Sequence, residues 1–300
     1  MMQQPSLPRL NQGYCYYEIL DSRAQGHQVL SYLSHYYQHS TEGVWLERLT
    51  KKEIFLDGKP ATALETLSPG QKLIWQRPPW QEDPVPRYFE LIYQDEDILV
   101  VNKPSGLPTM PAGGFLENTL LYLLRESYPE LSPVHRLGRG TSGLVIFARH
   151  SKAAQVLSQA WQDEVEKIYQ ALASEVANEA FYDIRAKIGL VDHPRLGKVY
   201  AASDKGKSAR SLAQVSGMQA QQTLFEVSLK SGRPHQIRIH LAYIGHPLVG
   251  DPLYDKGGVL LPSPGLPGDG GYCLHAAFLK FRQPSSGKFL ELHAPLVTAH

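Results

Sequence analysis

Three glycines, Gly138, Gly140 and Gly143, lie within a short stretch that is followed at once by the apolar run Leu144–Phe147. A run of this length is typical of a strand buried on both faces, and the glycines permit a tight turn in front of it. The spacing also matches the G-x-G-x-x-G pattern of dinucleotide sites, but such a site needs a helix directly after the glycines. The sequence therefore predicts a turn that faces a ligand and leads into a central strand, and it disfavours a nucleotide-dependent enzyme.

Composition places the chain among ordinary globular proteins. Its 300 residues are 42% hydrophobic and 20% charged, with a formal net charge of +1, so any affinity for nucleic acid must come from local clusters of charge. Two cysteines, Cys15 and Cys273, form neither a disulfide framework nor a zinc spacing. Neither a membrane-length apolar run nor a signal-peptide core is evident, so we expect a cytoplasmic protein without membrane association.

Proline marks the expected domain boundary. Residues 77–87 contain four prolines and read as a stiff linker between a small module, 1–76, and a larger core, 88–300. In the module we expect helices over residues 27–38 and 42–52, then a hairpin at the Asp57-Gly58 turn and a strand at Leu73–Trp75.

The core shows mixed strand and helix patterns, which predicts the α+β class. Ser151 is the expected N-cap of one helix, and Pro234 is expected in the first turn of another that runs to about Ile244 and ends at Gly245. The segment 257–271 is rich in glycine and proline and is expected to be a surface loop without an assigned role.

Several motifs, in collinear order, resemble those of the RluA family of RNA pseudouridine synthases. They cover about residues 88–296, and they are Asn102–Thr109, His135–Arg149, Lys167–Leu172, Ser231–His240 with Gly245–Asp251, Leu274–Ala276 and Leu292–Pro295. The resemblance implies a pseudouridine synthase core with a central mixed, mainly antiparallel sheet flanked by helices. The expected module resembles the αL RNA-binding module that precedes this core in many members, although a packing module without an RNA role is the alternative.

The resemblance implies isomerisation of uridine to pseudouridine in structured RNA, ribosomal or transfer, without a cofactor or metal. By resemblance, Arg136 displaces the target base, Tyr169 stacks on it, and Arg238 pairs with the catalytic aspartate and organises the site. The plainer alternatives are a surface cation, a core aromatic and a structural ion pair, for which Asp251 is a candidate partner. His135 is expected to position its loop.

Gly138 stands where the family has its catalytic aspartate. A glycine cannot act as a nucleophile or a base. A carboxylate such as Asp251 or Asp97 could reach the site, or the substrate or water could contribute in a different mechanism. A catalytically inactive RNA-binding or RNA-remodelling protein is the competing hypothesis.

A basic segment is the expected contact with RNA. Residues 195–240 hold eight lysines and arginines against two acids, a local charge of +6. The predicted RNA-binding residues are Lys103, Arg139, Arg195, Lys198, Lys205, Lys207, Arg210, Arg233 and His235. A solvated charged face is the alternative. His235, His240 and His246 lack a metal-site spacing, so we expect no metal.

Overall fold

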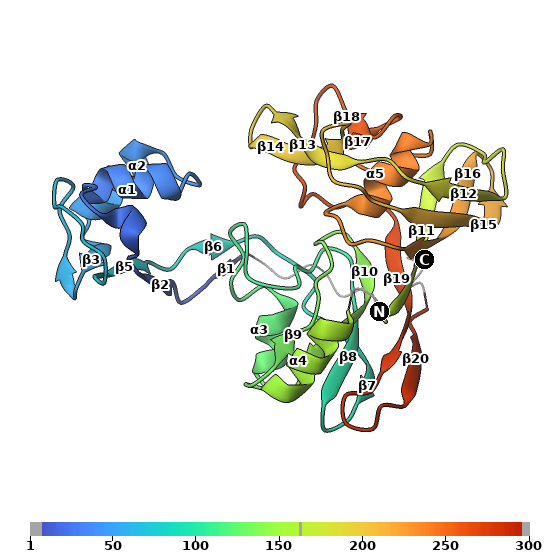
Figure 1. Cartoon of the computed structure of the whole chain (residues 1–300), viewed down its shortest axis with the longest axis horizontal. Helices are drawn as coiled ribbons and strands as arrows, with labels where there is room; N and C mark the ends of the chain where they lie inside the picture. The colour runs from blue at the N-terminus through green and yellow to red at the C-terminus, as the bar shows by residue number, and fades with distance from the viewer. Residues whose placement is uncertain (1–7, 162–163, 296–300) are drawn as a thin grey trace. The chain divides into compact units, whose positions relative to one another are not determined.

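The computed structural model describes residues 8–161 and 164–295, and its chain divides into two compact units (Figure 1). One unit spans Pro8–Glu82 and the other begins at Asp83. The division falls inside the predicted proline-rich linker. Each unit is described below by itself.

The first unit packs two helices against a small sheet. The helices are α1 (Val29–Tyr36) and α2 (Glu42–Thr50), and the strands β2 (Tyr14–Ile19), β3 (Ile54–Leu56), β4 (Lys59–Pro60) and β5 (Lys72–Arg77) pair in the order β2-β5-β3-β4, with a one-turn 3-10 helix, η1 (Ser22–Ala24), between β2 and α1. The predicted helices, hairpin and closing strand are confirmed. Strand β2 was not predicted, because its sequence YCYYEI is largely exposed and carries little apolar alternation.

The proline-rich segment is not a free linker. Its strand β6 (Gln81–Glu82) pairs with β1 (Arg9–Leu10), and Asn11 donates to Glu82 at 2.6 Å. Beyond Asp83 the chain packs on the second unit, where Val85 is buried and Arg87 donates to Asn118 at 2.8 Å. Main-chain pairing and burial therefore hold parts of the segment, and its role as a stiff linker stays a prediction.

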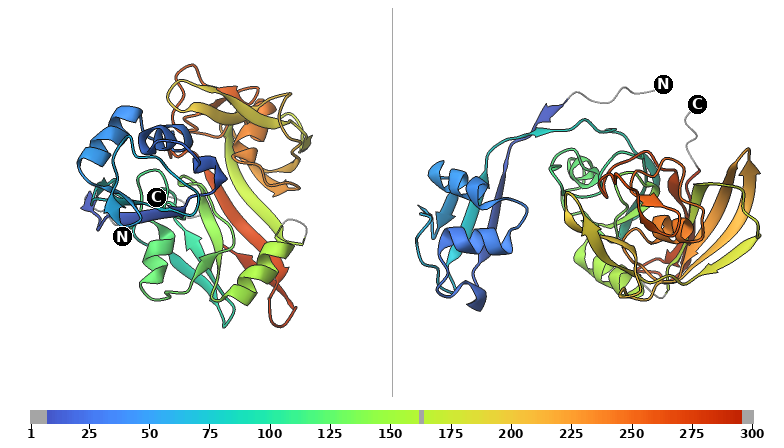
Figure 2. Two further views of the ribbon diagram at one scale, coloured as in Figure 1. Left: turned by 60° about the vertical axis from the view of Figure 1, so that its left-hand side comes forward. Right: turned by 90° about the horizontal axis from the view of Figure 1, so that it is seen from above.

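A twisted sheet organises the second unit, in the order β12-β15-β16-β11-β19-β10-β8-β7. These strands are β7 (Glu90–Gln94), β8 (Ile98–Lys103), β10 (Ser142–Ala148), β11 (Glu166–Ser174), β12 (Phe181–Ile184), β15 (Ser211–Gln219), β16 (Gln222–Leu229) and β19 (Leu274–Arg282), with β9 (Ser132–Pro133) beside β10 and β20 (Phe289–His293) beside β19. Among the described strands of this sheet, β10 and β19 form the one parallel pair. The predicted mixed, mainly antiparallel sheet is confirmed, and its long strands β11 and β19 run side by side in Figure 2.

Helices cover both faces of one half of this sheet. Helix α3 (Leu120–Arg125) packs with Leu99 and Val145 on one face of the sheet. Helix α4 (Ser151–Ala160) packs on the opposite face, which is formed by the alternate residues of the same strands. The predicted N-cap of α4 was one residue late. His150 caps the helix by accepting from the Ala153 amide at 3.2 Å.

Helix α5 (Gln236–Tyr243) lies between the other half of the sheet and a second layer of hairpins, β13 (Ile188–His193) with β14 (Gly197–Ala202) and β17 (Tyr254–Asp255) with β18 (Val259–Leu260) (Figure 1). This position explains why Gln236 to Ala242 are all buried. The helix begins later than predicted, because His235 adopts a left-handed backbone (φ 55°) after Pro234.

Candidate active site

The segment Asn102–Thr109 holds the Gly138 turn in place. Lys103 is fully buried, and its Nζ donates to the carbonyls of Pro104 (2.9 Å), Leu107 (2.7 Å) and Arg139 (3.3 Å). Ser105 Oγ donates to the Gly140 carbonyl at 2.8 Å. Burial lowers the pKa of Lys103 to about 7. The prediction that Lys103 contacts RNA was therefore wrong, since its ammonium group is enclosed by carbonyls and fixes the loop.

His135 and Arg136 come just before this turn, and their surroundings suit different roles. His135 Nε2 accepts from the Ile146 amide at 3.1 Å, and its ring stacks on Trp161 with centroids 4.2 Å apart. Burial, with a smaller contribution from Lys167, lowers the pKa of His135 to about 3, so the ring is neutral at pH 7. Its predicted positioning role fits these contacts. Arg136 is exposed and, among the described residues, forms no ion pair.

Tyr169 lies in β11 near the centre of the sheet. Its half-buried side chain packs against two core clusters, one containing Leu107 and Leu137 and the other containing Tyr272 and Leu274. Burial raises the pKa of Tyr169 to about 12. The ring is thus a neutral aromatic surface at physiological pH.

Arg238 and Asp251 form a buried ion pair. Arg238 Nε donates to Asp251 Oδ2 at 2.7 Å and Nη2 donates to Oδ1 at 2.8 Å, and the two side chains are 2% and 1% exposed. Nη1 donates to the Pro267 carbonyl at 3.1 Å. Asp251 Oδ1 also accepts from the amides of Leu253 and Tyr254 at 2.9 and 3.2 Å. The candidate partner named from the sequence is therefore the observed one.

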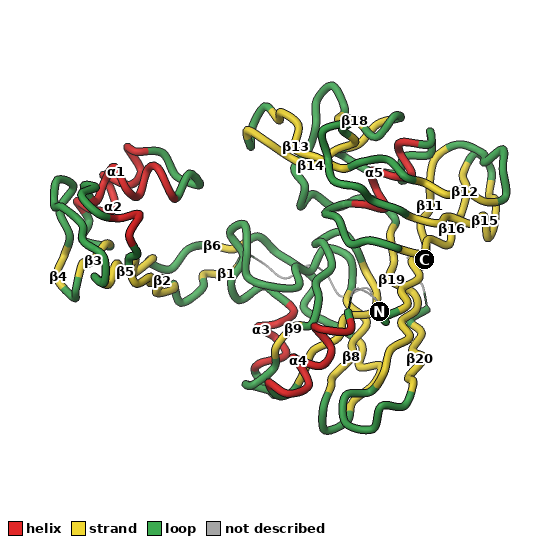
Figure 3. Tube along the Cα trace, viewed as in Figure 1, coloured by secondary structure: helices red, strands yellow, loops and turns green. Residues whose placement is uncertain are grey.

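The segment 257–271 contributes directly to the site, which the sequence did not predict. After the short strand β18 it runs as an irregular loop (Figure 3), and besides Pro267 it offers the Gly268 carbonyl, which accepts from Arg139 Nε at 2.8 Å. Asp269 lies 3.8 Å from Arg139. No local pattern could have placed this segment here, because glycine and proline specify a loop but not what the loop contacts.

Tyr272 follows this loop and lies against the Gly138 turn. Its hydroxyl is 3.2 Å from Thr141 Oγ1, and its ring lies under the Arg238 guanidinium at 4.2 Å. A Cβ added at Gly138 would be 3.3 Å from this hydroxyl. Tyr272 is thus the functional candidate that the sequence analysis missed.

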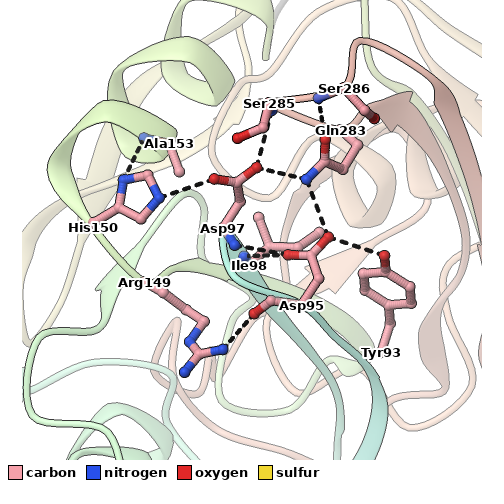
Figure 4. Close-up of polar contacts among 10 residues, drawn as sticks. All are labelled: Tyr93, Asp95, Asp97, Ile98, Arg149, His150, Ala153, Gln283, Ser285 and Ser286. Carbon is pink, nitrogen blue, oxygen red and sulfur yellow. Dashed lines mark hydrogen bonds and ion pairs between the residues drawn. The ribbon is translucent and has the colours of Figure 1, made fainter.

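Asp97 is not near Gly138. It lies just before β8, whose first residue, Ile98, pairs with Ala148 at the far end of β10 from the Gly138 turn. Figure 4 shows its carboxylate in a separate polar network. His150 contacts its Oδ1 at 2.9 Å, and Gln283 and the Ser285 amide donate to its Oδ2 at 2.5 and 2.9 Å. The hypothesis that Asp97 reaches the reaction centre was therefore wrong.

The predicted RNA-binding residues lie in different surroundings. Arg195, Lys198, Lys205, Lys207, Arg210 and Arg233 are all exposed. Lys198 and Arg210 form ion pairs with Asp192 (3.4 Å) and Asp183 (2.8 Å). Arg139 is half-buried and is bound by the loop 257–271.

The three histidines from the basic region bind protein atoms. His235 Nδ1 lies 2.7 Å from Tyr254 Oη, and burial, with a smaller effect of Arg238, lowers its pKa to about 4. It is therefore neutral at pH 7, and its predicted contact with RNA stays a prediction. His240 lies against Ser211 and Ala186, and His246 lies against Ser174. No described group of three or more His, Cys, Asp or Glu side chains could hold a metal ion.

Comparison with known proteins decides the family. Residues 97–243 match the family model described as RNA pseudouridylate synthase. An uncharacterised RNA pseudouridine synthase of Synechocystis, slr1592, is 39% identical over 89% of this chain and 94% of its own length. The chain belongs to the RNA pseudouridine synthase family. Ribosomal large subunit pseudouridine synthase D of Neisseria meningitidis is 32% identical, over 89% of this chain and 74% of its own.

A solved structure agrees with this assignment at the level of fold. Human RNA pseudouridylate synthase domain containing 4 superimposes with a TM-score of 0.55 at 23% identity, covering 70% of this chain and 89% of its own. The chain is thus an RNA pseudouridine synthase, an isomerase, and the relatives do not favour the inactive alternative. Across the described part of the synthase, no helix is long and apolar enough to span a membrane.

Proposed function

We propose that this synthase isomerises uridine to pseudouridine in structured ribosomal or transfer RNA, at the surface where the Gly138 turn, Tyr169 and Arg238 meet. The observation that carries the proposal is that Tyr272 packs in one core cluster with Tyr169, contacts Arg238 and faces the Gly138 turn. Motifs far apart in the chain therefore converge on one place. Synthase D of Neisseria, a relative named for the ribosomal large subunit, supports ribosomal RNA as the first substrate to test.

Each side chain at this place suits a separate task. Arg136 is exposed, so its planar cation can take the space of a displaced base and bind phosphate. Tyr169 offers a neutral ring on which uracil can stack. Arg238 is buried and already bound to Asp251 and Pro267, so we assign it a positioning role against the Tyr272 ring rather than a direct contact with RNA.

We also propose that the exposed cations of the β13–β14 region bind the RNA backbone. Lys205 and Lys207 are exposed on the loop that follows β14, on either side of Gly206, and within the described chain neither forms an ion pair. Replacing both with glutamine is expected to reduce the steepness of the plot of log K for RNA binding against log salt by about 1 to 2. Each lysine that no longer contacts a phosphate leaves one more counterion bound to the RNA. Filter binding between low and moderate salt measures this slope. Lys51→Gln is the matched control, since Lys51 is already paired with Glu47. An unchanged slope in the double variant would contradict the assignment.

The module of residues 8–82 is proposed as a second RNA contact that works by stacking. Tyr14 and Tyr16 are exposed on the same face of the sheet as Trp75, and the Tyr16 ring stacks on Trp75 with centroids 5.3 Å apart. Arg48 lies over Trp75 at 4.1 Å and over Trp45 at 4.5 Å. Aromatic rings next to arginine are suited to unpaired bases.

Fluorescence titration with single-stranded RNA tests this role of the module. Tyr16→Ala is expected to weaken binding by about 1–3 kcal/mol, the usual contribution of one stacked base. Leu64→Ala removes another exposed apolar side chain of the same module and serves as the control. Equal affinity of Tyr16→Ala and the parent protein would leave the module with a packing role alone.

The principal test of the activity is tritium release from ribosomal and transfer RNA transcripts labelled at uracil C5, because isomerisation must expel that hydrogen. Release by the wild-type protein is the expected outcome. An absence of release from either RNA, with binding intact, would instead support the RNA-binding alternative. A cytoplasmic location is part of the proposal, and the two free, exposed cysteines, Cys15 and Cys273, are compatible with a reducing compartment.

A further inference from the structure

The space that an aspartate side chain at position 138 would enter is occupied by the end of another residue. A Cβ built on Gly138 would lie 3.3 Å from Tyr272 Oη and 3.6 Å from Thr141 Oγ1, its nearest neighbours. The Gly138 backbone is outside the left-handed region, so an aspartate would be allowed there conformationally. What stands in its way is the tyrosine hydroxyl.

Contacts on three sides hold Tyr272 in this position. Its ring lies so close to Gly140 that a Cβ there would be 2.8 Å from Cε1, which only glycine permits. The Arg238 guanidinium covers the ring at 4.2 Å, and the Thr141 hydroxyl is 3.2 Å from Oη. Tyr272 is 5% exposed, so these contacts determine where its one polar atom lies.

The carboxylates near this place are already engaged. Both oxygens of Asp251 accept from Arg238, and one also accepts two backbone amides. Asp269 Oδ2 accepts from the Leu266 amide at 2.7 Å, and its Oδ1 faces Arg139. Neither is among the nearest atoms to a side chain at Gly138, whereas the Tyr272 hydroxyl is.

We propose that Tyr272 is the catalytic residue of this synthase and that its hydroxyl takes the position of the aspartate that is missing at Gly138. The proposal rests on the pseudouridine synthase activity proposed above. Tyrosine is chemically able to fill the role, since it forms covalent intermediates in enzymes and is the nucleophile at the sugar's anomeric carbon in one class of glycosidases.

The reaction balances with this one hydroxyl. Tyr272 Oη bonds to ribose C1′ as the C1′–N1 bond breaks, and the electron pair of that bond leaves with uracil. The phenolic proton moves to uracil N1, where pseudouridine retains it. The uracil then rotates, its C5 bonds to C1′, and the electron pair of the Oη–C1′ bond returns to the tyrosine as a phenolate. The phenolate takes the proton from C5 and is restored.

Arg238 supports this cycle without touching the substrate. Its cation lies over the Tyr272 ring at 4.2 Å and favours the phenolate that departs in the second step. Asp251 holds the guanidinium in place. Arg238 is therefore a positioning residue in this reaction.

The test is Tyr272→Phe, which removes one oxygen atom and retains the ring on which Arg238 and Gly140 pack. In single-turnover tritium release from C5-labelled ribosomal and transfer RNA transcripts, the rate is expected to fall at least about 100-fold, as when a group that acts on the reacting atoms is lost. RNA affinity and thermal midpoint are expected to stay at the wild-type values. Tyr93→Phe is the matched control, because it removes a tyrosine hydroxyl that binds Asp95 outside the site, and it is expected to keep the wild-type rate. Asp269→Asn tests the carboxylate that faces Arg139, and it is expected to retain most of the rate.

A second variant tests whether the two groups share one position. Gly138→Asp alone brings its Cβ within 3.3 Å of the tyrosine hydroxyl, whereas Gly138→Asp with Tyr272→Phe removes that contact. The double variant is expected to release tritium at least about 10-fold faster than Tyr272→Phe. A folded double variant with no gain would contradict the shared position.

The outcomes separate this inference from the proposed function. A wild-type rate in Tyr272→Phe, or a loss of rate confined to Asp269→Asn, would overturn the role of Tyr272 while the activity itself stands. A wild-type protein that releases no tritium from either RNA would contradict the proposed function, and the role of Tyr272 would be refuted with it.

Discussion

At the scale of single residues, buried charge is the costliest feature of this site. Arg238 is completely enclosed, and an enclosed guanidinium without a counter-charge is strongly destabilising. In this synthase Asp251 supplies the counter-charge in a bidentate pair, and the Pro267 carbonyl accepts a third hydrogen bond. The arginine can therefore remain in place although position 138 has no carboxylate.

Asp251→Asn is expected to lower the free energy of unfolding by about 3–5 kcal/mol, because it leaves a buried cation without its partner. Urea unfolding measures the change. Glu47→Gln is the control, since it breaks the exposed Lys51–Glu47 pair and is expected to leave the free energy of unfolding nearly unchanged. A loss below about 1 kcal/mol in Asp251→Asn would show that Arg238 has another acceptor.

His135 gives the synthase a predictable response to acid. Burial lowers its pKa from the ordinary value near 6.5 to about 3, so between these values the unfolded chain binds a proton that the folded chain does not. Its contribution to stability is complete above about pH 6.5 and is lost as the pH falls toward about 3.

His135→Gln is expected to be less stable than wild type at pH 7, with the difference shrinking by about 2 kcal/mol at pH 5. Glutamine can still accept from the Ile146 amide, and the other histidines are common to both proteins. Urea unfolding at pH 7, 6 and 5 gives the difference directly. If the difference stayed constant over this range, His135 would not be held neutral.

At the scale of elements, the parallel pairing of β10 with β19 determines where the site lies. These strands pair in parallel through Ser142 and Gly143, and a Cβ at Gly143 would lie 2.3 Å from the Ala276 carbonyl oxygen. Gly143 also has φ +110°, outside the range of other residues. This close approach brings the Gly138 turn, which precedes β10, beside Tyr272, which precedes β19.

Gly143→Ala is expected to lower the free energy of unfolding by at least about 3 kcal/mol, through steric overlap and backbone strain together. Gly217→Ala is the matched control within the same sheet, because its nearest neighbour atom would be 3.9 Å away. Thermal unfolding of both variants provides the comparison. Equal midpoints would mean that β10 and β19 can separate without cost.

At the scale of the whole molecule, the chain has two units with separate hydrophobic cores. Trp45, Ile54 and Leu67 belong to the core of the first unit, and Phe225 and Phe147 belong to cores of the second. Units with their own cores can open independently of one another.

Trp45→Ala is expected to destabilise the first unit alone by about 3–5 kcal/mol, the usual cost of emptying a large buried site. Hydrogen exchange read by mass spectrometry should show faster exchange in α1 and β5 with unchanged protection in β10 and β11. Phe225→Ala should give the reverse pattern. Joint loss of protection in both units would show that they unfold together.

The sequence by itself determined the family, the mixed α+β core and most local elements. The run Leu144–Phe147 is buried as predicted, and both helices of the module were found, because apolar periodicity and turn residues act over a few neighbours. By resemblance it also predicted that Gly138 departs from the family pattern, and it named Asp251 as a candidate partner for Arg238.

Only the tertiary structure decided which atoms surround Gly138. Lys103 resembled an RNA-binding cation until its burial among three carbonyls was known, and the loop before Tyr272 carried no signal beyond glycine and proline. Tyr272 lies beside Gly138 because β10 and β19 pair in one particular register. A contact of this kind depends on how strands far apart in the chain align, and local sequence patterns carry no information about that alignment.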